Sequence, residues 1–324
     1  MDNLKLIKKP VKEELAEFEK HFKKKIVSDI PFLNIITNYI LRHKGKQIRP
    51  LLVFLSSKLV GEINKSTYSA ATLIELLHTA TLLHDDVVDE SYERRNRFSI
   101  NAIWKSKVAV LLGDYFLASG LLLSIANNEY KLLETVSESV KEMSEGELIQ
   151  IQSSKKALID IDNYFKIIKK KTASLFASCT LCGAQSSTDN PVLLQKLKEY
   201  GLNIGIAFQI KDDLFDYQQK GLIGKPTGND IKDKKFTLPL ILALKNAPEN
   251  ESRTIIKKIN TADYSKYKYN EIVQFVDKNN GLIDTEKYLN EYKNKAIEIL
   301  DYFPDNETKQ SMCLFAEFII NRNK

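Results

Sequence analysis

Glycine and proline are scarce in this sequence, with 12 glycines and 8 prolines among 324 residues. Average usage would give roughly twice as many. Both residue types interrupt helices and form the tight turns that β proteins need, so their scarcity argues against a turn-rich β fold. Hydrophobic residues at 43% and charged residues at 28% lie in the ordinary range for soluble globular proteins. Long helices are therefore expected.

Cysteine is also rare. Cys179 and Cys182 form a single C-x-x-C pair, and Cys313 stands alone. A structural zinc site would need further ligands, and the surrounding sequence reads as helix, so we expect small buried thiols in a reducing compartment. The N-terminus shows no signal-peptide pattern, and the longest apolar stretch, 115–126, is too short to span a bilayer. We therefore predict a soluble, cytoplasmic protein.

Apolar residues recur at helical spacing along almost the whole chain. We predict helices over residues 11–25, 29–43, 48–60, 66–90, 99–127, 129–153, 160–187, 191–219, 232–246, 251–260, 266–279, 282–302 and 306–321. No linker-like composition divides them, so the prediction is an all-α, single-domain helical bundle over residues 1–324. The glycine-rich segment 220–230 interrupts the pattern, and we interpret it as a mobile lid beside a site.

Two clusters of aspartates close apolar helices. Asp85-Asp86-Val87-Val88-Asp89 ends the first helix, and Asp212-Asp213-Leu214-Phe215-Asp216 ends the second. The first and last carboxylates of each cluster are four residues apart and share a helix face. Carboxylates at a helix C-terminus repel one another and oppose the macrodipole, so a cation is expected there.

Hard carboxylate oxygens suit Mg²⁺, which keeps several waters and shares the oxygens of a bound phosphate. Two such clusters facing each other would hold several Mg²⁺ ions around one diphosphate and promote cleavage of its C–O bond. The apolar helices behind the clusters would wall a dry pocket for a hydrocarbon tail. We interpret the acidic side chains as metal ligands: Asp85, Asp86, Asp89, Asp212, Asp213 and Asp216.

Basic residues complement these clusters. The net charge of +6 is mild, and the lysines are dispersed without aromatic interleaving, so no nucleic-acid partner is expected. Lys46 and Arg49 stand at a predicted helix start, where backbone N–H groups also favour anions. Arg94-Arg95 follows the first cluster by five residues. Arginine forks suit bidentate phosphate binding.

Taken together, these residues resemble the trans-prenyltransferases, the polyprenyl diphosphate synthase family. The resemblance extends from about residue 44 to Arg322. It rests on ordered motifs: Gly45-Lys46-x-x-Arg49-Pro50, His78, His84-Asp85-Asp86-x-x-Asp89, Arg94-Arg95, Gly113-Asp114, Lys171-Thr172, Phe208-Gln209-x-x-Asp212-Asp213-x-x-Asp216, Gly224-Lys225 and Asp230-x-x-x-x-Lys235-x-Thr237-Leu238-Pro239.

The resemblance implies the all-α terpenoid-synthase fold around a deep cavity, a homodimer, and two diphosphate subsites. The allylic diphosphate would be held by Arg94, Lys171, Thr172, Gln209, Lys225 and Lys235. Isopentenyl diphosphate would be held by Lys46, Arg49, His78 and Arg95. Ionisation of the allylic substrate would precede attack by the isopentenyl double bond and loss of a proton. We expect Lys171, Thr172 and Gln209 to act on the reacting substrate, the last two through oxygen dipoles that stabilise the cation.

Small side chains precede the first cluster. Ala80 and Thr81 stand one turn before Asp85, where members of the family with short products carry aromatic residues, and Leu77 lies one turn further back. One helical turn approximates one isoprene unit, so the open turns predict a product of about six to eight units, such as a quinone side-chain precursor. The floor would come from residues 117–125. Weak membrane contact during product release is also expected.

Three alternatives remain open. A short-chain farnesyl or geranylgeranyl diphosphate synthase would share every motif and differ only in pocket depth. A terpene cyclase normally replaces the second aspartate cluster with an Asn/Ser/Glu triad and lacks the isopentenyl-binding basic residues. A non-catalytic partner subunit would be expected to lose carboxylates, whereas this sequence keeps all six.

Overall fold

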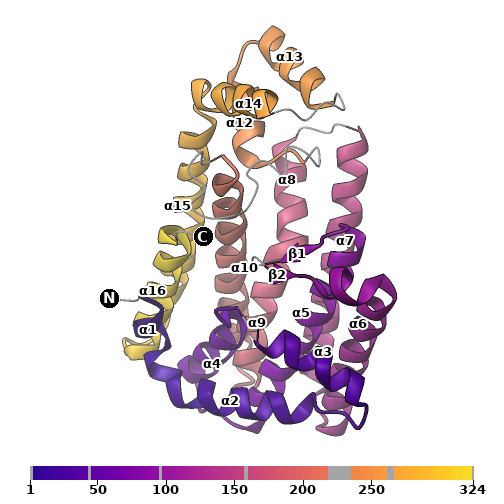
Figure 1. Ribbon diagram of the computed structural model, residues 1–324. Helices are drawn as coiled ribbons and strands as arrows, with labels where there is room; N and C mark the ends of the chain where they lie inside the picture. The colour runs from indigo at the N-terminus through magenta and orange to yellow at the C-terminus, as the bar shows by residue number, and fades with distance from the viewer. Residues whose placement is uncertain are drawn as a thin grey trace. The chain divides into compact units, whose positions relative to one another are not determined.

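The computed structural model describes residues 3–42, 45–94, 97–156, 160–217, 235–260 and 266–322, and helices dominate these ranges (Figure 1). In chain order they are α1 (Asn3–Lys8), η1 (Lys9–Val11), α2 (Lys12–Lys25), α3 (Pro31–Arg42), α4 (Ile48–Val60), α5 (Lys65–Val88), α6 (Ile100–Ala126), α7 (Tyr130–Lys156), α8 (Ile161–Ile168), η2 (Lys169–Ala173), α9 (Ser174–Gln185), α10 (Pro191–Phe215), α12 (Leu238–Asn246), α13 (Glu249–Asn260), α14 (Lys266–Lys278), α15 (Gly281–Leu300) and α16 (Glu307–Asn321).

The helices group into two compact units. Unit 1 comprises Met1–Val140, Phe176–Glu199 and Tyr302–Leu314. Unit 2 comprises Lys141–Leu175, Tyr200–Asp301 and Phe315–Lys324. Helices α7, α9, α10 and α16 have residues in both units. The all-α class expected from the sequence is confirmed, and one domain over residues 1–324 stays a prediction.

In unit 1, α5 packs along both α4 and α6 (Figure 1). Asn64 caps α5 by accepting hydrogen bonds from the backbone N–H groups of Ser66 and Thr67, which satisfies two of the first-turn donors. Gly120 brings α6 close to α5, because a Cβ there would lie only 3.2 Å from Leu73 Cδ1. The absent side chain therefore sets the spacing of the two helices.

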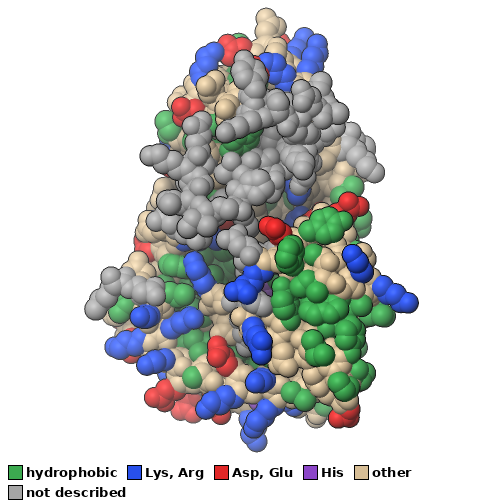
Figure 2. Space-filling view, in the orientation of Figure 1, with side chains coloured by type: hydrophobic (Ala, Val, Ile, Leu, Met, Phe, Trp, Pro, Cys, Tyr) green, Lys and Arg blue, Asp and Glu red, His purple; other side chains and the backbone are tan. Residues whose placement is uncertain are grey.

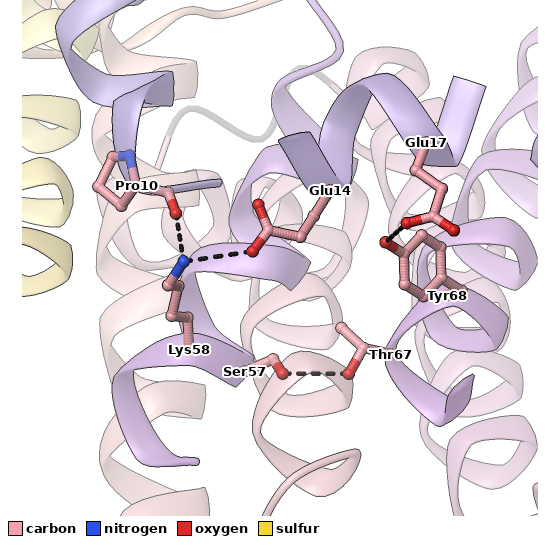
Figure 3. A network of polar contacts seen from close by, with 7 residues as sticks. All are labelled: Pro10, Glu14, Glu17, Ser57, Lys58, Thr67 and Tyr68. Carbon is pink, nitrogen blue, oxygen red and sulfur yellow. Dashed lines mark hydrogen bonds and ion pairs between the residues drawn. The ribbon is translucent and has the colours of Figure 1, made fainter. Parts of the chain in front are cut away.

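The N-terminal helices fasten onto this pair. Lys58 of α4 donates to the Pro10 carbonyl and to Glu14, and the Tyr68 hydroxyl of α5 donates to Glu17 over 2.8 Å (Figure 3). The Phe54 ring meets the Tyr68 ring edge-on at 5.2 Å between centroids. Such pairs contribute about 0.5–1.5 kcal/mol beyond the burial of their area.

Helix α6 contains a break at Lys105, whose φ of 71° and ψ of 163° lie outside the helical region. By length and composition α6 is apolar enough to cross a membrane, and a third of its most apolar window is buried within this chain. The prediction that no segment is long enough for this was therefore wrong, because the helix continues well before residue 115. A core helix of a soluble protein passes the same test.

A small hairpin follows α5. Strand β1 (Glu93–Arg94) pairs antiparallel with β2 (Arg97–Phe98), placing Arg94 opposite Arg97. No element was predicted between residues 90 and 99. The Ser99 hydroxyl donates to the Ser91 carbonyl and accepts from the N–H of Ala102, so one side chain closes the hairpin and caps α6.

Unit 2 has a core formed by α12, α13, α14 and α15, with Leu240, Ile272 and Val276 fully buried within it. The Tyr217 hydroxyl, just after α10, lies 2.7 Å from the Thr237 hydroxyl, just before α12. The predicted lid at 220–230 lies outside the described residues, as does the start of the helix predicted at 232.

The predicted helices are confirmed as elements, and several bounds agree closely, such as α4 over Ile48–Val60. The helix expected over 160–187 is instead α8 and α9 joined by η2, a turn of π-helix. Helix α1 was not predicted. Its six residues are too few for an apolar repeat to be read from the sequence.

Candidate active site

The first aspartate cluster closes α5 in unit 1. The Asp89 N–H caps the helix by donating to the Asp85 carbonyl over 2.8 Å, and the Ser91 N–H donates to the Asp86 carbonyl over 2.9 Å. Asp85 is half-buried, Asp86 is 4% exposed and Asp89 is exposed. The cluster therefore ends an apolar helix, as predicted, with its outer two carboxylates the more accessible ones.

His84 and Asp114 lie beside this cluster. The His84 Nε2 atom is 3.5 Å from Asp114 Oδ1 and 3.2 Å from the Val110 carbonyl oxygen. The His84 ring lies against Gly113, so any Cβ at that position would collide with it. At the Gly113-Asp114 motif, the glycine therefore leaves room for the His84 ring, and the aspartate contacts the same ring.

The predicted isopentenyl subsite residues that the structure describes also belong to unit 1. Gln47 is left-handed, with φ 54° and ψ 43°, and it precedes α4 immediately. Arg49 is the second residue of α4, its guanidinium 5.7 Å from the centre of the Phe176 ring, and Lys46 is exposed. His78 is buried in α5. Arg95 and the side chain of Arg94 lie outside the described residues.

The predicted chain-length residues line one stretch of α5. Ala80 is 0% exposed, Leu77 is buried, and the half-buried Thr81 donates its hydroxyl proton to the His78 carbonyl over 2.9 Å. Gly120 of α6, within the predicted floor segment 117–125, lies against Leu77. The floor segment therefore does contact the helix that was expected to form the pocket wall.

The second aspartate cluster closes α10 in unit 2. Arg322, after α16, forms an ion pair with Asp212 Oδ1 at 2.7 Å, donates to the Phe208 carbonyl, and stacks on the Phe208 ring at 3.7 Å. Burial lowers the pKa of Arg322, and the neighbouring Asp212 carboxylate opposes that shift. Asp216 follows the last helical residue, as Asp89 does in the first cluster.

Lys171 and Thr172 lie on η2, where the helix widens into a π-turn. Such turns are often found at functional sites. Gly146 of α7 permits the close packing here, because a Cβ at that position would lie 2.8 Å from the Lys171 backbone nitrogen. Lys171 Nζ donates to Gln150 Oε1 over 2.8 Å and also contacts Glu147. The lysine is thereby held against α7.

One cavity in unit 2 brings several predicted site residues together. Its lining includes Lys171, Thr172, Gln209, Asp213 and Lys235. The Thr172 hydroxyl donates to Gln209 Oε1 over 2.8 Å, and Gln209 Nε2 donates to Asp213 Oδ1 over 3.0 Å. Lys225, predicted for the same subsite, lies outside the described residues.

Two residues of this region escaped the sequence analysis. Tyr164 is 6% exposed, and its hydroxyl donates to Asp213 Oδ2 over 2.7 Å. A tyrosine on a predicted helix gives no signal of such a role. Arg322 was noted only as the end of the resemblance, although a charged residue directly after an apolar helix was a usable signal.

The aspartates suit a hard divalent cation by their chemistry. Asp212 already carries a cationic partner in Arg322, so this position accepts positive charge. Within the described ranges, no group of three or more His, Cys, Asp or Glu side chains could by itself hold a metal ion. Mg²⁺ usually binds through one or two carboxylates together with water and substrate phosphate, so single aspartates or pairs of them suit it by donor type. The residues therefore fit the predicted ion.

Comparison with known proteins identifies the family of this chain. An all-α fold with two aspartate clusters, each closing an apolar helix, fits the class of diphosphate-ester enzymes that the sequence predicted. The Polyprenyl synthetase family matches residues 30–276, and the chain belongs to this family, as its motifs predicted. It is 31% identical over 323 residues to the octaprenyl diphosphate synthase of Escherichia coli, covering 99% of this chain and 100% of that one.

Solved structures show the same fold. A polyprenyl synthase from Caulobacter crescentus, complexed with calcium and isoprenyl diphosphate, superposes with a TM-score of 0.91 at 30% identity over 98% of each chain. A geranylgeranyl pyrophosphate synthase from Bacteroides thetaiotaomicron superposes with a TM-score of 0.85 at 33% identity, covering 99% of this chain and 100% of that one. The sequence identities of these relatives to this chain are similar, although their names imply products of different length.

Proposed function

We propose that this protein is a Mg²⁺-dependent prenyltransferase that extends an allylic diphosphate with isopentenyl diphosphate to a long all-trans product. The observation that carries the proposal is the unit 2 cavity, where Lys171, Thr172, Gln209 and Lys235 come together from distant parts of the chain. Two lysines and two polar oxygens around one cavity suit an anionic ester that ionises.

The cavity residues divide by chemistry. Lys171 and Lys235 bind the allylic diphosphate as point charges. Thr172 and Gln209 present oxygen dipoles to the carbon that becomes cationic. Mg²⁺ held by the outer aspartates of a cluster would neutralise the negative charge that develops on the departing diphosphate. The chain's own residues position the ester, and no side-chain base is needed if the proton leaves to the diphosphate.

The second substrate is assigned to unit 1. Lys46, Arg49 and His78 are proposed to bind isopentenyl diphosphate. Support comes from the start of α4, where Arg49 occupies the second helical position and first-turn N–H groups favour an anion. The left-handed Gln47 beside them is a strained conformation of the kind that clusters at ligand sites.

The long product rests on α5. Ala80 leaves the first turn before Asp85 without a bulky side chain, and Thr81 is also small. With an open path along α5, the expected product contains about six to eight isoprene units. The name of the Escherichia coli relative, an octaprenyl diphosphate synthase, supports this length. A short-chain synthase is the second candidate, supported by the Bacteroides thetaiotaomicron structure.

The decisive experiment incubates purified protein with Mg²⁺, farnesyl diphosphate and excess labelled isopentenyl diphosphate, followed by chain-length analysis. A ladder ending at about C30–C40 is expected, and chelation with EDTA should abolish it. Lys171→Ala should block elongation, whereas Lys170→Ala, which removes a neighbouring lysine paired with Glu145 at 2.7 Å, should retain it. No incorporation with any allylic starter would refute the proposed activity, and a ladder that ends at C20 from farnesyl diphosphate, or at C15 from geranyl diphosphate, would refute only the length.

We further propose that the protein is a homodimer through an apolar face of unit 1. Figure 2 shows hydrophobic side chains gathered over α3, the hairpin and α6. On α6 the exposed apolar residues include Leu111, Leu122 and Ile125, and such a continuous patch is unusual on a monomer. Leu122→Glu should convert a dimer to a monomer in sedimentation, whereas Leu314→Glu, on α16 and 42% exposed, should not. A wild-type monomer would contradict the proposal.

A cytoplasmic location with weak membrane contact during product release completes the proposal. A long hydrocarbon product is poorly soluble in water, and the net charge of +6 favours anionic lipid surfaces. Flotation with anionic vesicles should recover little protein alone and more after turnover. Equal recovery in both cases would argue against release at a membrane.

A further inference from the structure

A chain of hydrogen bonds in unit 2 converges on Asp213. Tyr164 of α8 donates to Asp213 Oδ2 over 2.7 Å, and the Leu238 backbone N–H, at the start of α12, donates to the same oxygen over 3.2 Å. Gln209, one turn earlier on α10, donates to Asp213 Oδ1 over 3.0 Å. Three elements thus place a donor on one carboxylate that is 2% exposed. Each oxygen of this carboxylate accepts from the protein itself.

The direction of each hydrogen in the chain follows from this geometry. A carboxylate can only accept, so the Gln209 amide must turn its Nε2 atom toward Asp213. Its Oε1 atom then faces Thr172 and accepts the threonine proton over 2.8 Å. Because the threonine proton is committed to Gln209, the lone pairs of Thr172 Oγ1 remain for the cavity that both residues line. The orientation of two cavity dipoles is therefore set at Asp213.

Resting on the proposed function, we propose that Tyr164 is a positioning residue for prenyl transfer, which acts by fixing Asp213 and thereby the dipoles of Gln209 and Thr172. Asp213 serves as the hub of this chain rather than as a metal ligand. Its neighbour Asp212 is more accessible, with its side chain 42% exposed and paired with Arg322 at 2.7 Å. The roles of two adjacent aspartates are thus divided.

Electrostatics explains why a hub matters here. Dipoles stabilise developing charge only when they are oriented before the reaction, because reorientation during the reaction costs part of the gain. The Tyr164 hydroxyl holds one side of the carboxylate and the N-terminus of α12 holds it as well, where backbone N–H groups favour a negative charge. Without the hydroxyl, the carboxylate can rotate and the Gln209 amide loses its fixed direction.

The test uses Tyr164→Phe in the full-length protein. The ring remains in place, packed edge-on against Phe165 at 5.3 Å between centroids, and only the donor is lost. We expect kcat to fall about tenfold, since a hydrogen bond to a charged group contributes more than a neutral one. The KM values for both diphosphates and the half-saturating Mg²⁺ concentration should stay within about twofold, because binding groups are untouched.

Two further variants separate positioning from general loosening of the fold. Tyr68→Phe removes the same atom from another tyrosine–carboxylate bond of 2.8 Å, to Glu17 in unit 1, and should leave kcat unchanged (Figure 3). In a Thr172→Val background, Tyr164→Phe should have less than about a twofold further effect, because both changes act through the same chain.

A conservative change at the hub gives an independent readout. In Asp213→Asn the new amide must oppose either Gln209 Nε2 or the Leu238 N–H, so the Gln209 amide flips or the α12 contact is lost. We expect a fall in kcat larger than that of Tyr164→Phe with an unchanged Mg²⁺ requirement. Wild-type kcat in Tyr164→Phe, a multiplicative effect with Thr172→Val, or a raised Mg²⁺ requirement in Asp213→Asn would each overturn the inference. Failure of the proposed function would instead show as an inactive wild-type protein.

Discussion

Replacing Ala80 with tyrosine should shorten the product by a number of units that the geometry of α5 sets. Ala80 is fully buried, five residues before Asp85 on the same helix. From Ala80 back to Lys65, where α5 begins, the helix has fifteen residues, which is about 22 Å or four turns. If one turn accommodates one isoprene unit, a phenol ring at Ala80 removes up to about four units. The product should fall from about C30–C40 to as little as about C10–C20.

The assay is the elongation reaction with farnesyl or geranyl diphosphate and labelled isopentenyl diphosphate, resolved by chain length after removal of the diphosphate. Thr79→Tyr is the matched control, because Thr79 is the adjacent residue and is only partly buried, with its hydroxyl bonded to the Glu75 carbonyl. The Thr79→Tyr variant should keep the long product, because residue 79 points about 100° away from Ala80 around the helix.

Overpacking a buried site costs about 1–3 kcal/mol, so thermal melting should accompany the assay. A folded Ala80→Tyr variant that incorporates isopentenyl diphosphate and still reaches C30–C40 would refute the idea that the tail runs along α5. Short products from Ala80→Tyr and Thr79→Tyr alike would point to a general disturbance of α5 instead.

Two further predictions concern charge and burial. Arg322→Ala should lower the half-saturating Mg²⁺ concentration about two- to fivefold, because an ion pair with the partly exposed Asp212 is worth about 0.5–1 kcal/mol; a raised Mg²⁺ requirement in the elongation assay would contradict this. Burial raises the pKa of Cys179 to about 12 and raises that of Cys182 as well. At pH 8 a thiol reagent should therefore label Cys313 alone in the native protein and all three cysteines in guanidinium; rapid native labelling of either buried thiol would show the prediction to be wrong.

The sequence predicted well those elements that have strong local signals. Helix α4 agrees with its predicted bounds, and α5 begins directly after Asn64, a good capping residue. The π-turn at Lys169–Ala173 could not be read from the sequence, and it lies where α7 approaches closely at Gly146. Local propensity contains no information about a neighbouring helix.

The site shows the same division. Thr172 and Gln209 were singled out one at a time, by resemblance, and their mutual hydrogen bond joins residues 37 positions apart. The contact of Tyr164 with Asp213 spans 49 positions. Such pairs follow from packing of α8 and η2 against α10, so no periodicity within a single helix reveals them. A motif therefore identifies which residues matter, and the fold determines which of them act together.

The D-D-x-x-D pattern itself acquires a structural explanation from burial. In each cluster the middle aspartate is the buried one, Asp86 at 4% and Asp213 at 2% exposed, while the outer two are more accessible. Residues four apart share a helix face, and adjacent residues do not. The outer pair is therefore arranged to share a cation, and the middle carboxylate points elsewhere. In unit 2 this middle carboxylate is Asp213, the hub that accepts the hydrogen bond of Tyr164. A pattern that reads as three equivalent ligands thus encodes two different tasks, and only the middle position should tolerate loss of charge without a change in Mg²⁺ requirement.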